Sequence, residues 1–137
     1  MNDCIFCRIG LGEASAERIL ETEHTVAFLD INPKSIEHSQ VIPKTHVERL
    51  ADLDDELVAD VFKATRDVAS MLAGALKPDA FTIGINDGEA AGQEIAHLHV
   101  NIIPRFMGDR GGSIHSVVFK PPTERIQQTA SRIRAVA

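Results

Sequence analysis

The sequence contains no tryptophan and no tyrosine, and only two of its 137 residues are cysteines. It has no apolar run approaching the ~20 residues that a membrane-spanning helix needs. Its basic residues are not gathered into a stripe and its net charge is −6, so the electrostatic footprint of a nucleic-acid-binding protein is missing. These absences predict a globular protein whose partner is neither a membrane nor a nucleic acid.

What is present is ordinary for one folded domain. The length, a hydrophobic fraction of 44% and a charged fraction of 25% are typical of a soluble globular chain with one core. The first residues, MNDCIFCRIG, lack the basic region and long apolar stretch of a secretion signal. A cytoplasmic location is therefore the default expectation.

The two cysteines, Cys4 and Cys7, form a C-x-x-C motif. In a reducing cytosol a structural disulfide is not expected, which leaves a redox pair, half of a zinc site, or two incidental thiols. A redox motif should lie near a βαβ pattern, and none is found early in the chain. Zinc usually takes four ligands, so the remaining two would come mainly from the six histidines.

The hydrophobic pattern predicts an α+β domain with an antiparallel sheet. Alternating or short apolar runs predict strands, and apolar residues at helical spacing predict one long helix that begins near Asp54 and ends before Lys77-Pro78. The expected strands are 24–29, 39–42, 80–86 and 97–103, and the expected helices are 54–76 and a short final one over 122–135.

Residues 97–105 read HLHVNIIPR. Side chains of a strand alternate between two faces, so His97, His99 and Asn101 would share one face and the apolar residues between them the other. A polar row of this kind is either the plain outer face of a half-buried strand or a functional site. Two aligned histidines followed by an amide favour the functional site.

Several motifs in order resemble the histidine triad (HIT) family. They are CIFCRI near the start, DINP at 30–33, HSQVIPKTH at 38–46, INDGEAAGQE at 85–94 and HLHVNIIPR, and they cover the chain to about Arg110. The resemblance implies a HIT-like fold, with a five-stranded antiparallel sheet, a long helix and a short helix. It implies one HIT domain over 1–137, with a core of 1–110 and a C-terminal extension of 111–137, and a homodimer.

The resemblance also implies an enzyme that cleaves nucleoside phosphate derivatives at the α-phosphorus, such as nucleoside phosphoramidates or dinucleoside polyphosphates. The middle histidine of the triad, here His99, would be the nucleophile and carry a nucleotidyl intermediate. A neutral imidazole suits this role because its ordinary pKa is ~6.5. His38 would support the nucleophile from the neighbouring strand, and Asn101 holds the third triad position. The matching substrate-binding positions are Asn86 and Gln93 for the phosphate, Asp30 for the ribose, and Ile5, Phe6, Phe28 and Ile31 around the base.

Zinc-containing members of the family bind the metal with four residues whose counterparts are all present here. They are Cys4, Cys7, His46 and His97. A site with two thiolates and two imidazoles would be structural and closed.

The sequence departs from the family pattern at three places. Asn101 replaces the third histidine, although distant relatives, the galactose-1-phosphate uridylyltransferases, carry glutamine there. Glu94 replaces the usual Ser or Thr, and Ile36-Glu37 replaces Pro-Gly or Pro-Thr. The tail after the triad resembles that of bacterial members thought to act on dinucleoside polyphosphates, in which Arg105, Arg110 or His115 would hold a second phosphate or nucleoside.

Two other functions compete with the nucleotide hydrolase. Glu94 and Asn101 favour a protein that binds a nucleotide with low or lost activity. A zinc-dependent hydrolase with metal-bound water as nucleophile is the third, and the two thiolate ligands argue against it.

Overall fold

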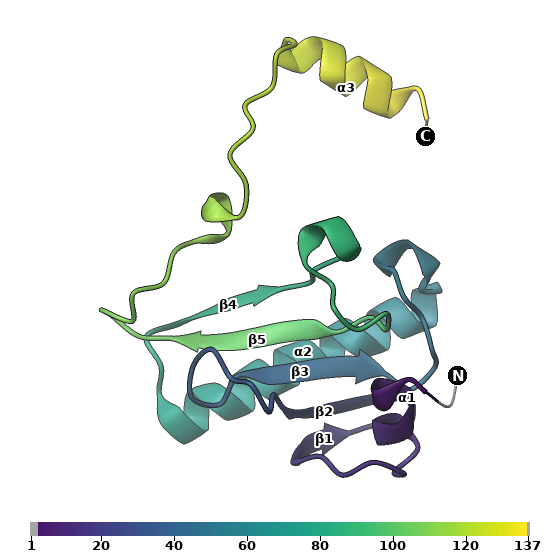
Figure 1. The fold of residues 1–137 in the computed structure, drawn as a ribbon, viewed down its shortest axis with the longest axis vertical. Coiled ribbons are helices and arrows are strands. Elements are labelled where there is room, and N and C mark those ends of the chain that lie inside the picture. Colours follow the sequence, from purple (N-terminus) through teal and green to yellow (C-terminus); the bar gives the residue numbers. More distant parts are fainter. Residues whose placement is uncertain (1–2, 137) are drawn as a thin grey trace.

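A computed structural model, which describes residues 3–136, shows a five-stranded antiparallel sheet with a long helix across one face (Figure 1). The strand order is β1-β2-β3-β5-β4, so β1 and β4 are the edges. The strands are β1 Arg18–Glu21, β2 Thr25–Leu29, β3 Ser39–Pro43, β4 Ala80–Gly84 and β5 Val100–Arg105. The helices are α1 Ile5–Gly10, α2 Asp55–Leu76 and α3 Ile126–Arg134, with 3-10 turns at Leu50–Asp52, Glu89–Ala91 and Ile114–Ser116. The predicted α+β HIT fold is confirmed.

Helix α2 forms where the apolar spacing predicts it. The Asp54 carboxylate accepts a hydrogen bond from the Leu57 amide at 2.8 Å and caps the first turn. Lys77 ends the helix in the left-handed conformation, with φ of 53°. The inward face of α2 packs on side chains of β2, β3 and β5. The buried residues of this core are Ala27, Val41, Val61, Ala64, Val68, Leu72, Val100 and Ile102.

Strand β5 begins later than the alternation of residues 97–103 predicts. The ladder starts at Val100, opposite Val41, and continues with Asn101 opposite Gln40. Before it, the Leu98 amide bonds the carbonyl oxygen of Val47 at 2.6 Å. His97 and His99 therefore lie on a segment held by the chain that follows β3, and not on the ladder itself.

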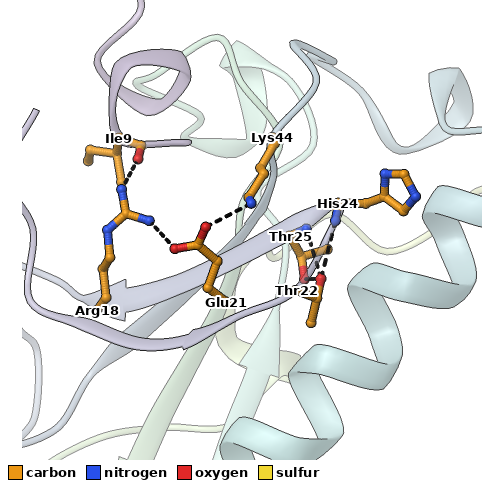
Figure 2. A network of polar contacts seen from close by, with 7 residues as sticks. All are labelled: Ile9, Arg18, Glu21, Thr22, His24, Thr25 and Lys44. Atoms are coloured by element: carbon orange, nitrogen blue, oxygen red, sulfur yellow. Dashed lines mark hydrogen bonds and ion pairs between the residues drawn. The ribbon is translucent and has the colours of Figure 1, made fainter. Parts of the chain in front are cut away.

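Two N-terminal elements, α1 and β1, were not predicted because both are short. The end of β1 is held by side chains, with Glu21 bonded to Arg18 at 2.6 Å and to Lys44 at 2.9 Å (Figure 2). The Lys44 ammonium, by hydrogen bond and charge, lowers the pKa of Glu21. At the β1–β2 turn the Thr22 and Thr25 hydroxyls meet at 2.6 Å (Figure 2). These polar contacts give a four-residue strand a defined end.

The final helix is shorter than the predicted 122–135. It begins at Ile126, because the side chain of Gln128 accepts from the Arg125 amide at 3.1 Å and fixes Arg125 as the N-cap. Pro122 therefore lies outside the helix. Across residues 3–136, none of the helices combines the length and apolar character that crossing a membrane requires.

Candidate functional site

The ring of His99 is held with one nitrogen engaged and the other bare. Its Nδ1 donates to the carbonyl oxygen of His97 at 2.8 Å, since a carbonyl can only accept. The neutral ring then carries its proton on Nδ1 and leaves Nε2 as an unprotonated nitrogen with a free lone pair. His99 is buried, with 8% of its surface exposed. A nucleophilic imidazole requires this tautomer, with a proton on Nδ1 and an unprotonated Nε2.

Phe6 on α1 packs against both histidines of the segment before β5. Its ring lies 5.2 Å from the His99 ring and 5.8 Å from the His97 ring, edge to face in both cases. An aromatic edge packed on an imidazole restricts the rotation of that ring. Helix α1 thus contributes to the orientation of His99, a role that no sequence motif indicated.

A chain of hydrogen bonds fixes the orientation of Asn101. The Lys34 amide donates to Nδ1 of His38 at 3.1 Å, so His38 carries its proton on Nε2. That Nε2 donates to Oδ1 of Asn101 at 3.1 Å. The Asn101 amide nitrogen, with two donors, is left for another acceptor. The Asp30 carboxylate lies 3.7 Å from the same His38 Nε2.

His38 is therefore bonded to Asn101 on the adjacent strand β5. The sequence had predicted only that it supports the nucleophile. The main-chain groups that set both histidine tautomers, Lys34 N–H and His97 C=O, carry no side-chain signal, so a sequence motif does not reveal them.

Four of the predicted residues come together at the N-terminus. Ligand atoms of Cys4, Cys7, His46 and His97 all lie within 4.8 Å of one another. The Sγ to Nδ1 distances are 3.4 Å for Cys4–His97, 3.2 Å for Cys7–His46 and 3.6 Å for Cys7–His97. With Zn–S of about 2.3 Å and Zn–N of about 2.0 Å, tetrahedral zinc separates sulfur and nitrogen ligands by about 3.5 Å. The spacing fits a tetrahedral metal ion.

The protonation of this group also fits a metal. Nε2 of His97 donates to the carbonyl oxygen of Pro43 at 2.8 Å, which leaves Nδ1 bare and turned toward the thiols. Burial lowers the pKa of His97 and so favours its neutral form. Burial, with the neighbouring Cys4, raises the pKa of Cys7 in the protein without metal. A divalent cation would reverse that second effect and bind the thiolates.

The two amide side chains predicted to bind the phosphate differ in the hydrogen bonds that they already make. Both ends of the Gln93 amide are occupied, because Oε1 accepts from the Gly88 amide at 2.8 Å and Nε2 donates to the Glu48 carbonyl at 2.9 Å. Asn86 is exposed and its amide lies near Gly92. The two hydrogen bonds of Gln93 order the loop before His97. To contact a phosphate, the Gln93 side chain would have to give up its hydrogen bond to the Glu48 carbonyl.

The four predicted base-binding residues fall into two pairs. Phe6 and Phe28 are buried in the smaller core cluster, with ring centroids 5.5 Å apart. Ile5 is partly exposed and Ile31 is 91% exposed.

Two of the residues that depart from the family pattern are Glu94 and Glu37, and the tail residues Arg105, Arg110 and His115 are those predicted to bind a second phosphate or nucleoside. Glu94 is exposed and makes no ion pair within the described part of the chain. Arg105 pairs with Asp109, at 2.7 Å from Nε to Oδ2, and not with Glu94. Glu37 has φ of 62°, and its buried Oε2 lacks a hydrogen-bond partner among residues 3–136. Arg110 and His115 are exposed.

Comparison with known proteins gives the family. A model of the HIT domain matches residues 11–108. "Protein hit" of Bacillus subtilis is 38% identical over 96% of this chain and 92% of its own length. The chain belongs to the HIT family.

Two relatives carry names that state an activity. The "Adenosine 5'-monophosphoramidase HNT1" of Saccharomyces cerevisiae is 38% identical over 74% of this chain and 62% of its own length. The "Adenylylsulfatase HINT3" of Arabidopsis thaliana is 38% identical over 76% of this chain and 53% of its own length. The family therefore includes nucleotide hydrolases at this level of identity.

Solved structures of other HIT family proteins superpose on this one along almost the whole chain. A crystal structure of a HIT family protein from Bacillus anthracis superposes with a TM-score of 0.87 at 32% identity, over 99% of this chain and 98% of that one. A zinc-bound histidine triad family protein from Mycobacterium smegmatis superposes with a TM-score of 0.75 at 32% identity, over 99% of each chain.

Proposed function

We propose that this protein is a hydrolase that cleaves nucleoside phosphate derivatives at the α-phosphorus through a nucleotidyl intermediate on His99. The observation that carries the proposal is the hydrogen bond from His99 Nδ1 to the His97 carbonyl, which leaves a bare Nε2 on a buried, oriented ring. Relatives named as an adenosine 5'-monophosphoramidase and an adenylylsulfatase support an adenylate as the nucleotide part.

The reaction has two displacements at phosphorus. Nε2 of His99 attacks the α-phosphorus, a P–N bond forms, and the bond from phosphorus to the leaving group breaks. The leaving group departs with the bonding electron pair and takes up a proton. Water then attacks the same phosphorus, the P–N bond breaks, and the products are a nucleoside monophosphate and the neutral His99 ring. The donation to the His97 carbonyl becomes stronger as the ring gains positive charge, which stabilises the intermediate.

Asn101 supplies a donor for the developing charge on the phosphate oxygens. Its Oδ1 is engaged by His38, so its amide nitrogen presents N–H groups on the strand that follows His99. An amide donor held in place before the reaction stabilises an oxyanion without reorganisation. Loss of one such donor typically lowers the rate on the order of 100-fold.

The Cys4, Cys7, His46 and His97 group would hold a structural zinc ion, in which the protein fills all four positions. The bound ion supplies a crosslink between α1, the segment after β3 and the residue whose carbonyl holds His99. It leaves no position for a reactive water, which argues against metal-bound hydroxide as the nucleophile.

The decisive experiment is turnover of adenosine phosphoramidate, adenylyl sulfate and diadenosine polyphosphates by the wild-type protein and by His99→Ala. We expect wild-type turnover, loss of activity in the variant, and a phosphorus-linked adduct on His99 when the wild-type protein is denatured during turnover. The surface variant His24→Ala is the matched control, and it should keep wild-type rates. Binding without turnover in the wild-type protein would identify a nucleotide-binding protein instead.

We also propose a homodimer that forms across the edge of β4. Ile83 on the edge strand β4 is exposed, although Phe81 of the same strand packs against the core under α2. Phe62 on α2 is exposed as well. An edge strand with apolar residues beside it is a common place for association. Light scattering at micromolar concentration should give twice the mass of one chain.

A further inference from the structure

The helical turn that carries both cysteines also carries Phe6. Cys4 is the N-cap of α1, and its sulfur accepts a hydrogen bond from the Cys7 amide at 3.4 Å. Phe6 lies between the two cysteines in the sequence, and its ring packs 5.2 Å from the ring of His99. A change in the geometry of this one turn would therefore move a side chain that restricts the proposed nucleophile.

The two sulfur atoms can reach each other with only a local change of the turn. They lie within 4.8 Å of one another, as do all the ligand atoms of the metal group, and both thiols are free. Residues three apart on a helical turn have Cα atoms about 5 Å apart, inside the range of about 4.4–6.8 Å that a disulfide allows. Since the chain has only two cysteines, Cys4 and Cys7 are the one pair that can form within it.

The two thiols differ in their access to solvent. Cys4 is partly exposed, whereas Cys7 is buried with 8% of its surface exposed. A small oxidant would therefore meet the Cys4 sulfur first, with the Cys7 sulfur close behind it. Redox-sensing cysteines have this arrangement, in which an accessible thiol lies next to a second thiol that resolves its oxidised form. In a reducing compartment a disulfide formed in this way is transient and serves sensing, not structure.

We propose that Cys4 and Cys7 are a site of reversible oxidation by hydrogen peroxide, whose disulfide displaces the metal ion and releases His99 from its fixed orientation. The Cys4 sulfur attacks one oxygen of the peroxide, the O–O bond breaks, and a sulfenic acid and water form. The Cys7 sulfur then attacks the Cys4 sulfur, an S–S bond forms, and the sulfenic oxygen leaves as water with the Cys7 proton. The cysteines lose two electrons, and the peroxide is reduced to two molecules of water.

The disulfide would act on His99 through two connections. It removes both thiolates from the metal group, because thiolate is the form that binds metal, and His46 and His97 alone do not complete a four-ligand site. His97 would keep the hydrogen bond to the Pro43 carbonyl at 2.8 Å and lose its other anchor. Phe6 would move with the turn and free the His99 ring. This inference rests on the proposed zinc ion and is independent of the chemistry at phosphorus.

The first test treats the zinc-loaded full chain with hydrogen peroxide. The tryptic peptide that ends at Arg8 contains both cysteines, and it should lose about 2 Da as the two thiol hydrogens leave. A chromogenic chelator should detect the release of one zinc ion per chain, and dithiothreitol with added zinc should reverse both changes. Chains joined to one another by disulfides, zinc retained after the disulfide has formed, or no disulfide in this peptide would overturn the proposal.

A matched pair of variants tests the order of the two cysteines. Cys7→Ser keeps the accessible thiol without its partner, so its sulfenic acid should persist under peroxide and be labelled by dimedone. Cys4→Ser keeps only the buried thiol and should be labelled at least about tenfold more slowly. Both variants lack one metal ligand, so a difference between them reports access to the sulfur. Equal labelling would contradict the assigned roles.

The second test follows the His99 ring without measuring activity. Heteronuclear NMR of the imidazole nitrogens should show His99 protonated on Nδ1 in the reduced zinc protein and a mixture of tautomers after oxidation. The double variant Cys4→Ser with Cys7→Ser is the control, and peroxide should leave its His99 signals unchanged. A single Nδ1 tautomer that persists after oxidation would overturn the connection to His99. Absence of zinc from the untreated protein would refute the metal site, whereas absence of the disulfide would refute this inference, so the two can fail separately.

Discussion

His97 holds His99 through its main chain while its own side chain belongs to the metal group. The carbonyl oxygen of His97 accepts from Nδ1 of His99 at 2.8 Å, and Nδ1 of His97 lies 3.4 Å from the Cys4 sulfur. One residue therefore connects the cysteine motif at the N-terminus to the orientation of the proposed nucleophile. Loss of the metal should disturb the active site through this residue, without any metal chemistry in the reaction.

We expect one zinc ion per chain in protein prepared without chelator. Cys7→Ser removes one of two thiolates and should abolish stoichiometric zinc and lower the melting temperature, because a bound ion stabilises only the folded state. Metal analysis and thermal unfolding measure both effects. His24→Ala is the control, because His24 lies near Glu56 and Asp60 in a separate surface group. Chelation that stops turnover at an unchanged melting temperature would indicate a catalytic metal instead.

Replacement of Glu94 by threonine should increase the rate on a simple nucleoside phosphoramidate. The carboxylate is exposed and not neutralised by Arg105, which is paired with Asp109. At about 4 Å, like charges repel by about 1 kcal/mol in water and about 4 kcal/mol at a partly buried site. We expect Glu94→Thr to raise kcat/KM about tenfold, which corresponds to about 1.4 kcal/mol, and less at high salt.

The control for this prediction is Glu89→Thr, an exposed glutamate of the same loop. Rates for Glu94→Thr within about twofold of wild type would show that the carboxylate does not reach the phosphate. A large fall would give Glu94 a positive role in catalysis.

Glu37→Gly should stabilise the protein. Glu37 adopts a φ of 62°, and its Oε2 is buried without a hydrogen-bond partner among the described residues. A left-handed conformation costs a residue with a side chain about 1–2 kcal/mol, and glycine removes most of this strain. We expect a gain of about 1 kcal/mol, which raises the melting temperature by roughly 3 °C for a domain of this size.

A matched variant separates the two causes of that effect. Lys77 also has a positive φ, of 53°, but it is exposed, so Lys77→Gly reports the backbone contribution alone. Glu37→Gln keeps the backbone and removes the charge. A fall in melting temperature for Glu37→Gly would mean that the Glu37 side chain makes a stabilising contact in solution.

Asp109 should titrate at unusually low pH. Arg105, by its hydrogen bond, and the amides of Phe106 and Gly111 hold the pKa of Asp109 well below its usual 3.8. An acid whose pKa is lower in the folded state stabilises the fold above the unfolded value and loses that contribution as the pH falls through the folded value. The stabilisation should therefore be complete above about pH 4 and decline below it. Arg105→Gln should return the Asp109 midpoint toward 3.8, as followed by carboxyl NMR shifts. Arg49→Gln should leave it unchanged.

The sequence by itself determined most of the elements and, through the resemblance to the HIT family, the candidate residues. The periodicity of residues 54–76 placed α2 almost to the residue, because an apolar face and a capping aspartate are local signals. The resemblance to zinc-containing HIT proteins named Cys4, Cys7, His46 and His97 as metal-ligand candidates, and the fold places their ligand atoms within 4.8 Å of one another. Helix α1 has six residues, fewer than two turns, and β1 has only four, so neither shows a periodic pattern in the sequence.

Only the tertiary structure decided which atoms are free to act. The tautomer of His99 depends on a carbonyl two residues away, and the orientation of Asn101 depends on a main-chain amide at Lys34 and on His38 across the β3–β5 boundary. Every residue except proline has the same main-chain hydrogen-bond donor and acceptor, so the residue types do not show which of these groups folding will use. The exposure of Val117, Phe119 and Ile133 has the same origin, since the sequence alone does not show which apolar side chains the fold leaves exposed.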